Sequence, residues 1–156
     1  MRPPLALFTS EPYSNTKHVY EQFTGQVGRV TFYEGEEPKE PSYFGIHSEF
    51  VKQSMKGKFQ RTIIIMMGCN GLTYSYMAEA FIEKGARAYI SWSNSVLASQ
   101  TDLATTRLLQ HFITENRTLK EAMRETFKEV GPDPLYKSFL LYYPLEAGNY
   151  TIKHHR

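Results

Sequence analysis

The feature that most restricts the fold is an unbroken apolar run, Thr62-Ile63-Ile64-Ile65-Met66-Met67. Its first four residues are β-branched, and nothing charged interrupts it. A half-exposed strand would alternate apolar and polar residues, and an amphipathic helix would repeat with the helical period. The run therefore predicts a strand buried on both faces, as in a parallel sheet covered by helices. Gly68 ends it.

The residues after this run read as helix and strand in alternation. Gly85 suits a helix C-terminus, and Thr118 with Glu121 forms a capping box at a helix start. The first run, the next helix and the next strand make one βαβ unit, which we expect to be right-handed. The expected elements are a helix over Tyr74–Lys84, a strand over Ala86–Trp92, a helix from Leu97 or Asp102 to Glu115, a helix from Thr118 to Gly131, and a strand over Phe139–Tyr143.

The first half of the chain has weaker patterns. Four Glu, two Pro and one Gly between Glu34 and Pro41 predict a solvated loop, and Ser48 predicts the cap of a helix. The other expected elements are strands over Leu5–Phe8 and Val27–Tyr33, an edge strand over Tyr43–Ile46, and helices over Thr16–Phe23 and Ser48–Met55. We expect one α/β domain over residues 1–156, best supported between residues 60 and 143.

Composition excludes several classes of protein. The net charge of +2 is too small to indicate a nucleic-acid partner, and the longest apolar run is too short to cross a bilayer. The first residues lack a secretory pattern, so we expect a cytoplasmic protein. The lone cysteine, Cys69, rules out an internal disulfide and a multi-cysteine metal cage. Phosphate-loop and metal-helix motifs are absent, so we expect no cofactor and no metal.

Cys69 lies just after the buried run and a few residues before a helix. Ligands of open α/β sheets bind beyond the carboxyl ends of the strands. A helix start favours a thiolate, and backbone N–H groups at Gly68 and Cys69 could hold an oxyanion. The alternative is an inert buried cysteine, which is a common fate of a lone Cys.

A nucleophilic thiol normally needs a base. His47 is the candidate among five histidines, because it follows an extended run and precedes a helix, although capping or turn packing at the helix entry fits it better than catalysis. We expect surface or core-edge roles for the remaining histidines and a surface position for the two acidic residues near the C-terminal turns. These residues are His18, His111, His154, His155, Asp133 and Glu146.

Three segments together are similar to the caspase-like cysteine peptidases, in the gingipain-like and CHAT-domain group of prokaryotic and archaeal proteins. They are Ile63–Gly71, Ala78–Ala86 and Tyr89–Trp92. The resemblance covers about residues 60 to 143. It implies a three-layer sandwich with a mostly parallel central sheet, a Cys69 nucleophile and a peptide or protein substrate. It also places Asn70, Ser91, Trp92 and Ser93 near the substrate pocket.

The family's catalytic His follows another strand end, and neither His18 nor His47 has that setting. By the resemblance, the strand that bears it is expected upstream of Met1, together with the first strands of the sheet and any export signal. Two functions stay open: a cysteine peptidase domain that uses Cys69, and a non-catalytic module that binds a peptide or partner in the same groove. Substrate side chain and oligomeric state stay open as well.

Overall fold

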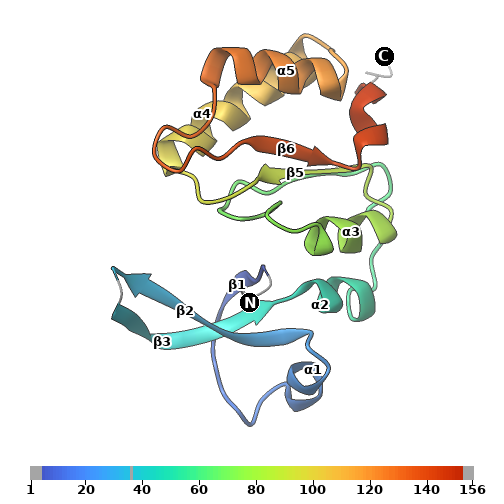
Figure 1. Ribbon diagram of the computed structural model, residues 1–156. Helices are drawn as coiled ribbons and strands as arrows, with labels where there is room; N and C mark the ends of the chain where they lie inside the picture. Colours follow the sequence, from blue (N-terminus) through green and yellow to red (C-terminus); the bar gives the residue numbers. More distant parts are fainter. Residues whose placement is uncertain (1–4, 36, 153–156) are drawn as a thin grey trace.

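The computed structural model describes residues 5–35 and 37–152 (Figure 1). It contains two small three-stranded sheets, which corrects the prediction of one mostly parallel central sheet. The first sheet is fully antiparallel, with strand order β1-β3-β2, and the second is mixed, with order β4-β5-β6. The strands are β1 (Leu7–Pro12), β2 (Val27–Glu34), β3 (Glu37–Ile46), β4 (Ile63–Ile65), β5 (Ala88–Trp92) and β6 (Leu140–Tyr143).

The first sheet contains the segment that was predicted to be a loop. β2 and β3 form a long antiparallel hairpin, and β3 is the central strand rather than an edge. Charges and prolines are tolerated because the hairpin end is exposed, and opposite charges meet across it. Arg29 bonds Glu40 at 2.7 Å, and Lys39 pairs with Glu34. The polar composition therefore reflects exposed strand ends.

The second sheet contains the predicted βαβ unit. β4 and β5 are parallel, and α3 (Tyr76–Glu83) lies between them in the chain. β5 is central and buried at every position, whereas β4 is an edge strand whose three isoleucines are only half-buried. The unbroken apolar run predicts full burial of Ile64 in a central strand, and this prediction is wrong. β6 runs antiparallel to β5, so the sheet is mixed.

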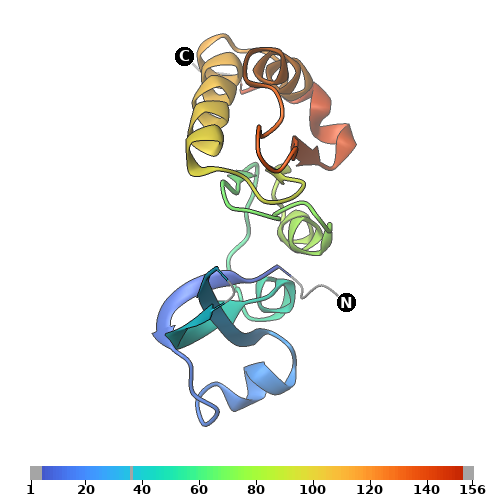
Figure 2. The same cartoon turned by 60° about the vertical axis from the view of Figure 1, so that its left-hand side comes forward.

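Helices cover both faces of the second sheet. In Figures 1 and 2, α3 lies on one side of it, and α4 and α5 lie on the other. Ile63 and Ile65 pack into the cluster on the α4–α5 side, and Ile64 packs into the cluster on the α3 side. The apolar run thus contributes side chains to two hydrophobic clusters, one on each face of the sheet. The helical elements here are α4 (Ala98–Leu109), the π-helical turn η1 (Gln110–Thr114), α5 (Leu119–Val130) and the 3₁₀ turn η2 (Leu145–Asn149).

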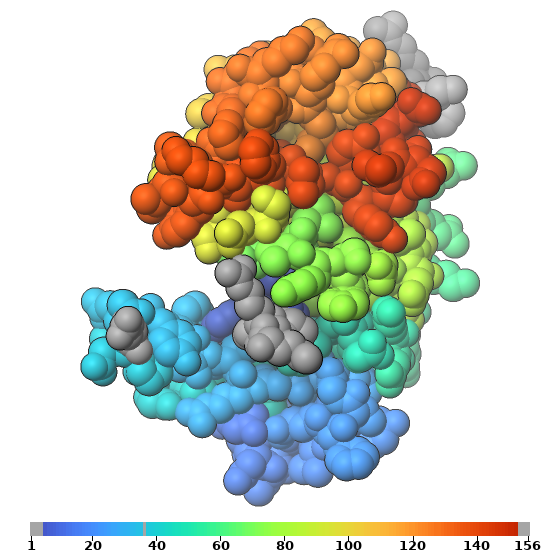
Figure 3. Space-filling model, in the orientation of Figure 1, coloured from blue at the N-terminus to red at the C-terminus, as the bar shows by residue number. Residues whose placement is uncertain are grey.

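The two sheets are joined through α2 (Ser48–Gln53), which packs on α3. Val51 of α2 and Met77 of α3 are buried in one cluster, against which Leu5, Leu7 and Tyr143 pack. Figure 3 shows the N-terminal half, in blue and cyan, in contact with the green α3 region. α1 (Val19–Phe23) has no buried residue.

Local start and stop signals were predicted with mixed success. The capping box of Thr118 and Glu121 is confirmed, and α5 ends at Gly131, whose φ is 71°. α2 begins at Ser48 itself, and His47 is its N-cap, so the predicted Ser48 cap is wrong. Within the described residues, no helix is long and apolar enough to cross a membrane.

Candidate functional site

Cys69 lies in a turn at the carboxyl end of the β4–β5 pair. Met66, Met67 and Gly68 separate it from the last residue of β4, and its side chain is exposed. Six residues separate it from α3, since that helix begins only at Tyr76. The thiol is therefore accessible, and the helix start that was expected to activate it lies further along the chain.

A different helix start lies beside the sulfur. The Val96 N–H donates to Cys69 Sγ with an N···S distance of 3.4 Å. The Val96 carbonyl oxygen lies 3.6 Å from Sγ and accepts the thiol proton. Val96 immediately precedes Leu97, the N-cap of α4. The N–H can donate to the sulfur and the carbonyl can accept from the thiol, so both backbone polar groups of Val96 contact the Cys69 side chain.

A buried carboxylate fixes the segment that contains Val96. Asp133 has no exposed surface. Its Oδ2 accepts the Leu97 N–H at 2.8 Å, and its Oδ1 accepts N–H groups of Leu135 at 2.9 Å and Tyr136 at 2.6 Å. Burial acts to raise the pKa of Asp133, but these N–H donors outweigh it and hold the pKa below its ordinary value.

This geometry corrects the prediction that Asp133 is a surface residue. Ser138 adds a second clamp, because its hydroxyl donates to the Ser95 carbonyl at 2.6 Å. The turn after α5 therefore sets the position of residues 95–97 against Cys69. Asp133 stands between two prolines, and an Asp in such a turn often accepts backbone N–H groups two or three residues on. This proline-flanked aspartate was visible in the sequence, but the segment was used only to predict the end of the preceding helix.

Three of the residues that the resemblance places near a pocket lie at the end of β5, where Ser91 and Trp92 are the last two residues of the strand and Ser93 follows them. Ser91 and Trp92 are fully buried. The Ser91 hydroxyl donates to the Met66 carbonyl at 2.7 Å, and the Trp92 indole donates to Thr101 Oγ1 at 2.9 Å. Ser93 is half-buried, and its hydroxyl accepts the Phe139 N–H at 3.0 Å. Through these hydrogen bonds, the buried side chains of Ser91 and Trp92 stabilise the turn that contains Cys69.

The backbone around Cys69 keeps donors available. Asn70 has a left-handed φ of 62°, and its N–H bonds the Asn94 carbonyl at 3.0 Å. The N–H groups of Gly68 and Cys69 have no acceptor among the described residues. Gly71 packs so closely on Ser91 that a Cβ there would collide with the serine side chain. The turn therefore contains two backbone N–H groups that no acceptor in the described part of the chain uses.

His47 is held away from a contact with the thiol. Its backbone N–H bonds the Gln26 carbonyl at 2.9 Å, and its Nε2 lies against Gly28. Its Nδ1 is buried without a hydrogen-bond partner. His18 contacts Glu11 at 3.0 Å. His154 and His155 lie outside the described residues, and no histidine within 5–35 and 37–152 is hydrogen-bonded to Cys69.

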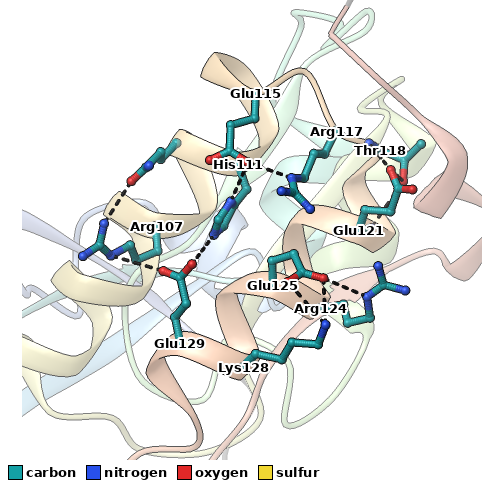
Figure 4. Close-up of polar contacts among 11 residues, drawn as sticks. Arg107, His111, Glu115, Arg117, Thr118, Glu121, Arg124, Glu125, Lys128 and Glu129 are labelled. Atoms are coloured by element: carbon teal, nitrogen blue, oxygen red, sulfur yellow. Dashed lines mark hydrogen bonds and ion pairs between the residues drawn. The ribbon is translucent and has the colours of Figure 1, made fainter.

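His111 has a structural role that the sequence did not indicate. It is buried in η1 and lies between two carboxylates, with Glu115 3.1 Å from Nδ1 and Glu129 3.1 Å from Nε2 (Figure 4). Arg117 pairs with Glu115, and Arg107 pairs with Glu129. The histidine can donate to both carboxylates only as an imidazolium. The network joins η1 to α5.

This network predicts acid sensitivity. The hydrogen bond from His111, and next that from Arg117, lower the pKa of Glu115 below its ordinary value. A depressed folded-state pKa stabilises the fold above the unfolded pKa, and this stabilisation is lost as the pH falls through the folded pKa. We expect Glu115→Gln to flatten the decline of the unfolding free energy below about pH 4.3. Urea unfolding at several pH values measures it.

Glu37→Gln is the matched control, since Glu37 is exposed and forms no ion pair with the described residues. It should leave the slope of stability against pH nearly unchanged. Identical slopes for the wild-type chain and Glu115→Gln would contradict the assignment.

Comparisons with known proteins do not place the chain in a family. The sequence matches no family model and no curated protein, and no solved structure matches it. Within the described residues, no group of His, Cys, Asp and Glu side chains is arranged to hold a metal ion.

Proposed function

We propose that Cys69 is the nucleophile of a cysteine-peptidase type site that takes the carbonyl of an extended peptide. The observation that carries the proposal is the exposed sulfur that accepts the Val96 N–H beside two unpaired backbone N–H groups. The similarity of Ile63–Gly71 and Tyr89–Trp92 to caspase-like peptidases supports it. The proposal rests on this turn and not on the arrangement of the sheet.

The chemistry would proceed by acyl transfer. The Cys69 thiolate attacks the peptide carbonyl carbon, and the carbonyl oxygen becomes an oxyanion. The N–H groups of Gly68 and Cys69 would donate to that charge. The C–N bond then breaks, the amine leaves with a proton, and water hydrolyses the thioester. A base must take the thiol proton and, as its conjugate acid, give a proton to the leaving amine. His47 stays a candidate for this role only if its ring leaves Gly28.

A second function is a non-catalytic module that binds a peptide or protein partner at the same turn. The observation that favours it is the absence of an imidazole at Cys69 Sγ within the described residues. Both functions use a polypeptide ligand and neither uses nucleic acid. Cys69-dependent cleavage in a peptide library would select the peptidase, and binding without turnover would select the module. A lone exposed thiol also persists best in a reducing compartment, which supports a cytoplasmic location.

The first test is the reactivity of the thiol. We expect iodoacetamide to label folded Cys69 at neutral pH about fivefold faster than the chain unfolded in guanidinium, because one N–H donor to a thiolate is worth about a typical hydrogen bond. Mass spectrometry of the labelled chain over time measures the rate. Cys69→Ser is the control and should take up no label.

His47→Ala separates the two functions further. We expect it to leave the labelling rate unchanged within a factor of about two, because neither ring nitrogen is hydrogen-bonded to Cys69. A loss of more than about tenfold would make His47 the base. Labelling that appears only on unfolding would contradict the nucleophile itself.

A further inference from the structure

We propose that the cavity at the amino ends of β4 and β5 binds a small dianionic compound, a phosphate ester or a dicarboxylate. The cavity has a volume of about 560 Å³, which suits a small molecule. Its lining includes Arg61, Arg87, Glu146 and the small residues Gly85 and Ala86. Cys69 lies beyond the opposite ends of these strands, so the cavity is a separate site.

Two arginines, Arg61 and Arg87, line this cavity. Neither Arg61 nor Arg87 forms an ion pair with the described residues, whereas Arg29, Arg107, Arg117 and Arg124 all do. The Arg87 guanidinium lies over the Tyr150 ring at 4.9 Å. This cation–π contact holds the guanidinium at the ring, and its N–H groups can still donate to an oxyanion.

The loop before β4 brings the first arginine to this place. Lys56, Lys58 and Arg61 are exposed in a segment without an acidic residue. The Phe59 N–H bonds the Lys84 carbonyl at 2.8 Å, and the Arg87 N–H bonds the Thr62 carbonyl at 2.8 Å. The two segments that carry the arginines are therefore joined by backbone hydrogen bonds.

The backbone at Arg61 is unusual for a side chain of this size. Its φ is 58°, in the left-handed region that favours glycine. Such conformations persist where the surroundings impose them, and they are frequent at ligand sites. At this position the conformation places a cation at the rim of a cavity that already holds Arg87.

The pair of arginines sets the chemistry of the ligand. Guanidinium groups bind phosphate and carboxylate oxygens in a bidentate manner, and two of them match a group or molecule with two negative charges. Glu146 lines the same cavity and would repel bare anions. A ligand that also carries a hydroxyl or ammonium donor would turn this repulsion into a hydrogen bond. The best ligand is thus a dianion with such a donor.

Isothermal titration at constant ionic strength tests the site, with inorganic phosphate, O-phosphoserine and malate as probes. We expect saturable binding, with O-phosphoserine or malate tighter than inorganic phosphate. Tighter binding of O-phosphoserine would indicate a phosphate ester as the ligand, and tighter binding of malate would indicate a dicarboxylate. Arg87→Gln and Arg61→Gln should each weaken binding at least tenfold, and thermal unfolding of each variant shows whether it is folded. Either variant alone, if folded, decides the test.

Three controls make the result specific. Arg124→Gln removes an arginine on α5 and should not change the affinity, and Cys69→Ser should not change it either. Glu146→Gln should raise the affinity for inorganic phosphate. It should also reduce the difference between this affinity and the affinity for O-phosphoserine. The inference is overturned if no probe saturates at millimolar concentration, or if Arg124→Gln weakens binding as much as the cavity variants do.

Discussion

Trp92→Ala is expected to lower the free energy of unfolding by about 3–5 kcal/mol, the usual cost of truncating a buried aromatic residue. Trp92 is 0% exposed at the end of the central strand β5, and it packs with Val96 and Ala104. Its indole donates to Thr101 Oγ1, and the Thr101 hydroxyl donates to the Met67 carbonyl at 2.9 Å. The substitution therefore leaves a cavity and frees the residues before Cys69. Urea denaturation followed by circular dichroism measures the loss.

Phe23→Ala is the matched control, because Phe23 is an aromatic residue that is 89% exposed. We expect it to change the free energy of unfolding by no more than about 0.5 kcal/mol. Similar losses for the two variants would show that Trp92 is not the structural support of the turn.

Asp133→Asn is expected to slow iodoacetamide labelling of Cys69 about fivefold, the equivalent of one typical hydrogen bond. The amide cannot accept all three N–H groups that the carboxylate accepts, and its own NH₂ would face a donor. Residues 95–97 then lose their anchor, and the Val96 N–H moves away from Sγ. The thermal unfolding temperature should also fall. Labelling kinetics and calorimetry on the same samples measure both effects.

Asp102→Asn is the control for this prediction, since Asp102 is exposed on α4 and its side chain forms no hydrogen bond with the described residues. It should change neither quantity. A fall in unfolding temperature with unchanged labelling would show that Asp133 stabilises the fold without positioning Val96. If wild-type Cys69 does not label in the folded state, the nucleophile proposal fails instead, and the two failures are distinguishable.

The candidate site was only partly visible in the sequence. The position of Cys69 after an apolar run identified the accessible thiol, because such a run followed by glycine ends at the rim of a sheet. The contact with Val96 could not be predicted, because α3 and β5 lie between Cys69 and Val96 in the sequence, and only the tertiary structure brings the two residues together. Asp133 was missed for the same reason, since it lies 36 residues from Leu97, whose N–H it accepts.

Local interactions explain what the sequence determined by itself. The capping box at Thr118, the parallel pairing of β4 with β5 and the presence of a strand at β5 each depend on short stretches of residues with a clear pattern. Only the tertiary structure decided that β4 is an edge strand, that β6 is antiparallel, and that residues 37–46 form a central strand. The pattern of apolar and polar residues in a segment shows which of its faces are buried. The number and direction of the strands beside it are set by long-range packing, which the pattern of one segment does not contain.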